Sequence, residues 1–335
     1  MQDTTAAPGA LVRQLIMGFR STSLLHVAAE LGLADRLAGG PRSAAELASE
    51  LGAHADALGR VLRGLVAFGV FARRADGRYA LTDLGACLRD DAPGSLRAVA
   101  RIFGHAYIQH PWGELLHTVM TGQTAFDHVF GMDSFAYLTA HPEMVATFNR
   151  ALTTATPAIV AAYDFSGPGL VVDVGGGSGG LLAGLLAANP ATRGIVFDLP
   201  HSADAAAQTL AAAGVADRGR FEAGDFFAAV PPGADAYLLK LILHDWDDDR
   251  CGAILRACRR AVAPQGRVLI IERRLPDDDE SGFEAVLADI NMLAATGGRE
   301  RGEAAYRALL ARADFALARA IPTASPFHIF EGTPI

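Results

Sequence analysis

The second half of the chain alternates short runs of β-branched residues with helical segments, and this alternation limits the fold more than any other feature. Strands separated by helices favour βαβ units, whose strands lie parallel in one sheet with helices on both faces. The predicted strands are 170–174, 194–199, 220–226, 235–243 and 267–275, followed by strand-like runs at 315–321 and 327–331. The predicted fold is therefore α/β, with a doubly wound, mainly parallel, Rossmann-like sheet.

The first half of the chain is almost entirely helical in pattern, and the character of the sequence changes in the segment 163–169. This change predicts two domains. Residues 1–165 are expected to form an N-terminal all-α domain, and residues 166–335 are expected to carry the sheet.

Part of the N-terminal domain has the layout of a winged helix-turn-helix, with helical patterns at 43–52 and 55–71 and a hairpin pattern around Asp76-Gly77. Such a module either binds DNA or packs against other helices. A recognition helix needs basic residues to contact phosphates, but 55–71 offers only Arg60 and Arg63. The whole chain has 29 Lys and Arg against 37 Asp and Glu. The sequence therefore favours a dimerisation module without a nucleic-acid partner, and a metabolite-sensing transcription regulator is the alternative.

No run of the sequence approaches the roughly 18 uncharged apolar residues of a transmembrane helix, and MQDTTAAPGA lacks the pattern of a secretory signal. The three cysteines, Cys87, Cys251 and Cys258, form no C-x-x-C pattern, which fits a reducing compartment. A cytoplasmic protein with no membrane partner is expected.

A glycine-rich loop, GGGSGG at 175–180, joins the strand 170–174 to a helix. Glycines let the backbone approach a ligand closely, and the start of a helix offers free N–H groups. Asp198 ends the next strand, where a carboxylate can bind a ribose diol. This pattern is compatible with a nicotinamide dinucleotide, with S-adenosylmethionine, or with a turn that binds nothing.

The acidic residue before the glycines favours one of these ligands. Asp173 would repel a pyrophosphate, but it would attract the ammonium group of S-adenosylmethionine, which has no phosphate. Asp225 ends the following strand and could accept from the adenine amine, while Phe226 could cover the adenine ring. The sequence therefore favours S-adenosylmethionine as cofactor.

The segment LLKLILHDWDDDRC at 238–251 is the most informative part of the chain, because His244 follows an apolar strand at its carboxyl end. Open α/β sheets place their chemistry at that edge, which favours a functional histidine over a structural one. Asp247, Asp248 and Asp249 are predicted to be a helix N-cap and first-turn acids rather than metal ligands. No cluster with the spacing of metal ligands is visible, so no metal is expected.

The motifs DVGGGSGG, FDLP, GDFF, KLILHDWDDDRC and GGRERG, in this order, resemble those of the plant-type, caffeate O-methyltransferase-like family. These enzymes methylate small molecules with S-adenosylmethionine, which leaves as S-adenosylhomocysteine. The family's bacterial members act on aromatic natural products in secondary metabolism and antibiotic biosynthesis. The resemblance implies an O-methyltransferase for a hydroxylated polyketide, naphthoate or related phenol, and a homodimer formed through the N-terminal domain.

The resemblance also implies residue roles. His244 is expected to be the general base, and Glu272 and Glu300 match two acids that bracket it. The segment 148–152 departs from the plant pattern. The predicted cofactor-binding residues are Asp173, Gly175, Gly177, Asp198, Leu199, Asp225, Phe226 and Lys240, and the predicted substrate-binding residues are Phe148, Asn291, Met292 and Trp246.

Three other activities stay open on the sequence alone. One is a family member recruited to an S-adenosylmethionine-assisted hydroxylation or decarboxylation, against which the retained His244 argues. The second is methylation of a carboxyl group or a nitrogen. The third is an NAD-dependent oxidoreductase, against which Asp173 argues.

Overall fold

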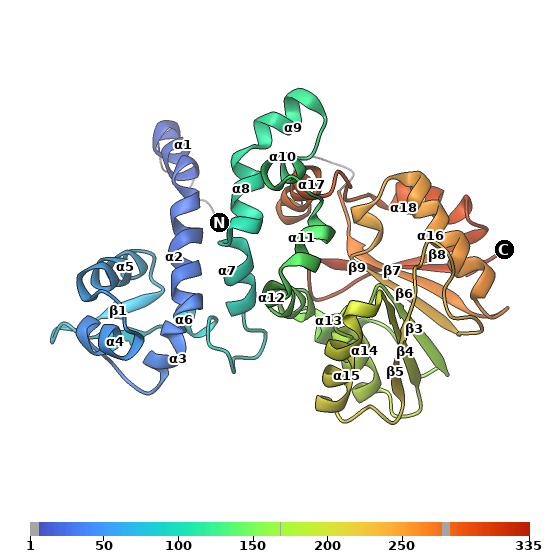
Figure 1. Ribbon diagram of the computed structural model, residues 1–335, viewed down its shortest axis with the longest axis horizontal. Coiled ribbons are helices and arrows are strands. Elements are labelled where there is room, and N and C mark those ends of the chain that lie inside the picture. The colour runs from blue at the N-terminus through green and yellow to red at the C-terminus, as the bar shows by residue number, and fades with distance from the viewer. Residues whose placement is uncertain (1–6, 168, 277–281) are drawn as a thin grey trace. The chain divides into compact units, whose positions relative to one another are not determined.

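The computed structural model describes residues 7–167, 169–276 and 282–335 (Figure 1). The chain divides into two compact units, Met1–Gln109 and His110–Ile335. Among the described residues, no helix has the length and apolar character that crossing a membrane requires.

The first unit is helical apart from one short hairpin. Its core gathers side chains from α3, α4 and α5 around Leu33, Leu47 and Leu62. The elements are α1 (Pro8–Ile16), α2 (Gly18–Glu30), α3 (Leu33–Ala38), α4 (Ala44–Leu51), α5 (Ala55–Ala67), β1 (Phe71–Arg73), β2 (Tyr79–Leu81), α6 (Asp83–Ala86) and α7 (Arg97–Phe103). The predicted order of two helices and a hairpin is confirmed: β1 pairs antiparallel with β2, and Gly77 lies between them with a φ of 84°.

The second unit begins with helices and continues as an α/β fold; α8 (Ala106–Gly113) contains the division between the units. The helices are α9 (Leu115–Thr121), α10 (Ala125–Phe130), α11 (Ser134–Ala140), α12 (Pro142–Thr153), α13 (Thr156–Ala162), α14 (Gly180–Ala188), α15 (Ala203–Ala212), α16 (Asp248–Ala261), α17 (Phe283–Ala295) and α18 (Glu303–Ala311), with short 3-10 turns η1 (Pro200–Ser202) and η2 (Leu243–Asp245). The strands are β3 (Leu170–Val174), β4 (Arg193–Asp198), β5 (Gly219–Ala223), β6 (Ala236–Lys240), β7 (Arg267–Arg273), β8 (Phe315–Pro322) and β9 (Phe327–Pro334).

These strands form a seven-stranded sheet in the order β5-β4-β3-β6-β7-β9-β8. The pairs from β5 to β7 are parallel, and β9 runs antiparallel to both β7 and β8. The predicted doubly wound, mainly parallel sheet is therefore confirmed. β3 and β6 are neighbours, with β4 and β5 on one side of them and β7 on the other, so the order of strands along the chain reverses between β3 and β6. Such sheets bind ligands at this point, beyond the carboxyl ends of the strands.

Successive residues of each strand point to opposite faces, and each face has its own apolar core. Val172 and Tyr237 face α16 and α18, whereas Val171 and Leu238 face α13, α14 and α15. The inner strands β3, β4, β6 and β7 are thus buried on both sides, which explains why they are apolar at consecutive positions.

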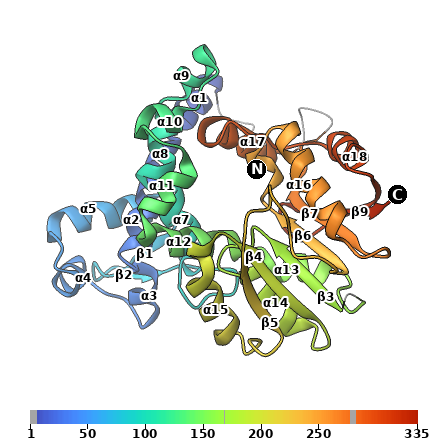
Figure 2. The ribbon, with the colours of Figure 1, turned by 45° about the vertical axis from the view of Figure 1, so that its right-hand side comes forward.

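Several boundaries differ from the sequence analysis, and two of them bear on the site. The strand predicted for 235–243 ends at Lys240, because Leu241 has a φ of 56° and the chain turns into η2. The helices of 110–165, which the sequence groups with the front domain, pack in the second unit, where α10 contacts α17 and both α12 and α13 contact α14 (Figure 2). The assignment of all of 1–165 to a dimerisation domain therefore stays a prediction.

Candidate active site

The glycine loop follows β3 and has the backbone conformation that its glycines permit. Gly175, Gly177 and Gly179 have φ values of 68°, 55° and 74°, in the left-handed region. At Gly175 a Cβ atom would lie 2.4 Å from Ile242 Cδ1 and 3.6 Å from Phe226 Cε1. The loop therefore brings bare backbone close to Phe226 just before α14 begins.

Asp173 lies at the end of β3 and is 2% exposed. Its Oδ2 atom is buried without a hydrogen-bond partner among the residues that the structure describes. Burial raises the pKa of Asp173 to about 7, although the Lys240 ammonium opposes the shift. A buried, unsatisfied carboxylate oxygen beside the glycine loop fits a cationic ligand group and would repel a phosphate.

Lys240 ends β6, the strand next to β3. Its Nζ donates to Leu152 O at 2.8 Å, at the end of α12. Burial lowers the pKa of Lys240 to about 8, against the opposing influence of Asp173. Buried Asp173 and half-buried Lys240 therefore lie close enough for each charge to act on the pKa of the other.

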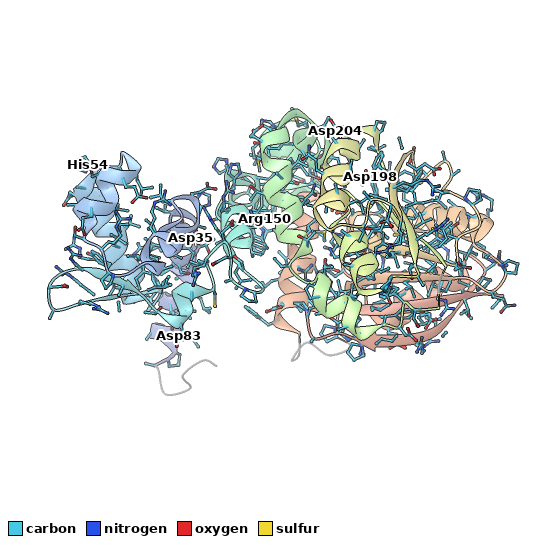
Figure 3. All side chains as sticks on the ribbon, turned by 90° about the horizontal axis from the view of Figure 1, so that it is seen from below. Asp35, His54, Asp83, Arg150, Asp198 and Asp204 are labelled. Carbon is cyan, nitrogen blue, oxygen red and sulfur yellow. The ribbon has the colours of Figure 1, made fainter. Side chains whose placement is uncertain are left out.

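Asp198 lies at the end of β4, and Figure 3 marks its position. Its Oδ2 accepts from Gly177 N at 2.7 Å, and its Oδ1 accepts from Leu199 N at 2.6 Å. These bonds place the carboxylate against the glycine loop. Asp225 follows β5; it is exposed, and its Oδ1 accepts from Phe227 N at 2.8 Å. The structure therefore brings Asp198, Gly177 and Phe226 to one edge of the sheet.

His244 lies in η2, which follows β6 at the same edge, and is 6% exposed. Its Nδ1 atom lies 3.1 Å from Glu300 Oε1 and 3.6 Å from Glu272 Oε2. Its Nε2 atom lies 3.7 Å from Asp245 Oδ1, beyond hydrogen-bond distance. With two carboxylates beside Nδ1, the neutral imidazole carries its proton there, and Nε2 keeps the lone pair.

The charged groups around His244 set the pKa at which its imidazole binds a second proton. Burial lowers the pKa of His244, but Glu272, Asp245 and Glu300 outweigh burial and raise the pKa above its ordinary range. Burial raises the pKa of Glu272, and the His244 imidazolium opposes that shift. The imidazole is therefore a stronger base than histidine in water.

The same cluster has the donors of a metal site, which the sequence did not reveal because Glu272 and Glu300 lie 28 and 56 residues from His244. One ligand atom of each residue lies within 4.8 Å of the others. However, Glu272 Oε1 already accepts from Ile242 N and Leu243 N, both at 2.9 Å. That no metal takes part stays a prediction, and full turnover in EDTA is its test.

The predicted substrate-binding residues come from three elements. Trp246 follows η2 and stacks on Phe135 of α11, with ring centroids 5.5 Å apart. Asn291 of α17 accepts a 2.8 Å hydrogen bond from the indole N–H of Trp112. Phe148 lies on α12 and Met292 on α17. The contacts of these residues with a substrate stay predictions.

Four residues near these positions were not in the predicted set: Trp112, Phe135, Asp245 and Arg301. Asp245 and Arg301 adjoin predicted residues, so the motifs HDW and GGRERG contained a signal for them. Trp112 and Phe135 belong to an aromatic-rich segment whose spacing does not show which rings contact the site.

Four features together define a Rossmann-like methyltransferase domain. They are the sheet order, the glycine loop after β3, the acid that ends β4 and the histidine beside carboxylates after β6. The chain belongs to the O-methyltransferase family, because a family model for the O-methyltransferase domain matches residues 112–316. A second model, for the O-methyltransferase dimerisation domain, matches residues 13–91.

Individual relatives agree with this family. The chain is 44% identical over 330 residues to a phenazine O-methyltransferase from Lysobacter antibioticus, covering 97% of this chain and 96% of the relative. The crystal structure of LaPhzM superposes with a TM-score of 0.93 at 43% identity, covering 98% of this chain and 100% of the other. An O-methyltransferase of neocarzinostatin biosynthesis, solved with S-adenosylhomocysteine and 1,4-dihydroxy-2-naphthoic acid, has a TM-score of 0.77 at 38% identity and covers 94% of this chain and 96% of its own.

The protein is therefore an S-adenosylmethionine-dependent O-methyltransferase, and the predicted fold class, family and enzyme class are confirmed. The comparisons support methyl transfer to oxygen and give no support to an oxidoreductase or to a recruited reaction.

Proposed function

We propose that this enzyme methylates a phenolic hydroxyl of a planar aromatic natural product, with His244 as the general base. The observation that carries the proposal is the imidazole at the ligand edge of the sheet, with carboxylates beside Nδ1. Relatives whose names include a phenazine and a dihydroxynaphthoate substrate support the class of acceptor. Stacked Trp246 and Phe135 offer a flat aromatic surface of the kind that such an acceptor would pack on.

The residues around the glycine loop would hold S-adenosylmethionine. The unsatisfied Oδ2 of buried Asp173 fits its ammonium group. Asp198, whose Oδ2 accepts from Gly177 N, would also accept from the ribose hydroxyls. Asp225 and Phe226 would contact the adenine, and Lys240 would lie near the methionine end. When bound, S-adenosylmethionine supplies an electrophilic methyl group.

His244 would take the phenol proton on Nε2. An ordinary phenol has a pKa of about 10 and an ordinary histidine about 6.5, so complete proton transfer in water costs about 5 kcal/mol. The carboxylates around His244 reduce this cost, because they stabilise the imidazolium that forms. Glu300 accepts from Nδ1–H and thereby keeps Nε2 directed away from itself.

The experiment that tests this function measures methyl transfer to a panel of hydroxylated phenazines, naphthoates and simple phenols, followed by His244→Gln with the best acceptor. We expect turnover to fall by about 10²–10⁴-fold, with unchanged affinity for S-adenosylhomocysteine by calorimetry. Raising the pH should partly restore the variant, because the phenol then ionises without a base. A variant with wild-type turnover at pH 7 would contradict the role of His244.

We further propose a homodimer formed through the first unit, which the match to the dimerisation domain supports. In α1 no residue is buried within the described part of the chain, and Leu15, Ile16 and nearby Phe19 are 63%, 64% and 59% exposed. Such a run of exposed apolar side chains is typical of a protein interface. Light scattering that gives the monomer mass of 35.1 kDa at micromolar concentration would refute the dimer.

A further inference from the structure

The Glu272 carboxylate accepts hydrogen bonds from the backbone N–H groups of the turn that carries His244. Glu272 Oε1 accepts from Ile242 N and Leu243 N at 2.9 Å and from His244 N at 3.4 Å. Leu241, just before the turn, has a left-handed φ of 56°, a conformation that costs energy for a residue with a side chain. The turn therefore requires outside contacts to keep its shape.

The carbonyl side of the same turn is held by the loop that follows α17. Arg301 Nη1 donates to Leu243 O at 2.8 Å, and Arg301 Nη2 donates to Trp246 O at 2.7 Å. The carbonyl of His244 itself accepts from Arg299 N at 2.8 Å. One guanidinium therefore joins the carbonyls on the two sides of His244.

Arg301 is itself fixed in place. It is 3% exposed, and its Nε and Nη2 atoms donate to Asp248 Oδ1 at 3.1 and 2.8 Å. Its backbone carbonyl accepts from Leu275 N at 3.1 Å, just beyond β7, the strand that carries Glu272. A side chain held at both ends can define the position of the turn that it contacts.

We propose that Arg301 is a positioning residue for methyl transfer, which sets the placement of the His244 imidazole by pinning the carbonyls of Leu243 and Trp246. This inference rests on the proposed function of His244. The planar guanidinium is needed because two parallel N–H groups must reach two carbonyls at once, which a lysine ammonium on a flexible stem does not reproduce. The neighbouring residue, Glu300, contacts the imidazole Nδ1. The segment 298–301 thus controls both the backbone of the turn and the orientation of the ring.

The test is Arg301→Lys, which keeps the positive charge and removes the planar guanidinium with its two parallel N–H groups. We expect kcat to fall at least tenfold, because a misplacement of about 1 Å at a reacting group can cost 10²-fold. The affinity for S-adenosylhomocysteine should stay within twofold, since the side-chain hydrogen bonds of Arg301 within the described residues go to the turn, to Arg299 and to Asp248, not to the glycine loop. The matched control is Arg218→Lys, because Arg218 also pins backbone carbonyls, those of Leu186, Asn189 and Thr192, at the far end of α14.

A second measurement separates positioning from general structural support. In ¹³Cε1-histidine spectra, assigned with His244→Gln, we expect His244 of Arg301→Lys to titrate at lower pH than in the wild type, because a displaced ring loses contact with its carboxylates. The titration in Arg218→Lys should match the wild type. Wild-type kcat and titration in Arg301→Lys, or equal losses in Arg218→Lys, would overturn the proposal.

Two further results keep the outcome decisive. If Arg301→Lys does not fold, Asp248→Ala replaces it, because Asp248 is largely exposed and anchors the guanidinium. We expect smaller decreases in kcat and in the titration pH of His244, and an Asp248→Ala variant with neither decrease would contradict the proposal. If His244→Gln retains turnover, the general-base role fails. The titration of His244 in Arg301→Lys still measures positioning in that case, since it needs no catalysis.

Discussion

Substitution of Gly298 tests how closely the loop that follows α17 packs on η2, the turn that carries His244. A Cβ atom built on Gly298 would lie 1.9 Å from His244 O and 2.7 Å from Asp245 C. Real Cβ atoms essentially never approach another atom within 3.0 Å, so Gly298→Ala must separate the two backbones by about 1 Å. The obstacle is main chain rather than the end of a flexible side chain, so it cannot rotate away.

We expect Gly298→Ala to lower kcat by about 10²-fold, the cost of a displacement of about 1 Å at a reacting group. Radiolabelled methyl transfer to the best acceptor of the panel measures kcat, and calorimetry should show unchanged affinity for S-adenosylhomocysteine. The control is Gly39→Ala, because Gly39 has a φ of −77° and open space around its Cβ position. If Gly298→Ala keeps wild-type turnover, the close packing of this loop on the His244 turn does not govern catalysis.

Three further predictions concern single carboxylates. Glu300→Gln should move the rising limb of kcat against pH to lower pH, because the amide still accepts from Nδ1 but no longer raises the pKa of His244; an unchanged limb would show that Glu300 does not act through its charge. Asp198→Ala should weaken S-adenosylhomocysteine binding at least tenfold in calorimetry, the size of a lost hydrogen bond to a charged group, and unaltered affinity would remove the ribose contact from the site. Asp173→Asn should weaken that binding yet raise the melting temperature of the ligand-free enzyme at pH 8. The folded pKa of Asp173, about 7, lies above the ordinary 3.8, so the carboxyl contributes progressively less stability as pH rises from about 4 to 7. A lower melting temperature than wild type at pH 8 would contradict this account, and differential scanning fluorimetry measures it.

Much of the fold follows from local pattern. Runs of apolar residues and the glycines at 175–180 are short-range patterns, so the sequence alone predicts the sheet and the loop that precedes α14. The N-cap at Asp247 is another local feature, and its side chain accepts from Arg250 N at 2.8 Å as expected.

The end of β6 was not predictable in the same way. The apolar run continues to Leu243, but the strand stops at Lys240, because the buried Glu272 carboxylate accepts the N–H groups of Ile242 and Leu243 that a longer strand would use in the sheet. A contact between residues 29 or 30 positions apart overrides the local preference for strand.

The sequence by itself determined a doubly wound domain with a glycine loop and a histidine at the carboxyl edge of its sheet. These features follow from the spacing of apolar residues and from the residue types in turns, which depend only on residues close together in the chain. Resemblance to a family added Glu272 and Glu300 as neighbours of that histidine. Only the tertiary structure decided which ring nitrogen they face, that Asp173 Oδ2 is buried without a partner among the described residues, and that Arg301 joins the carbonyls around the turn. Those features depend on distances between side chains from separate strands and loops, and packing alone sets such distances.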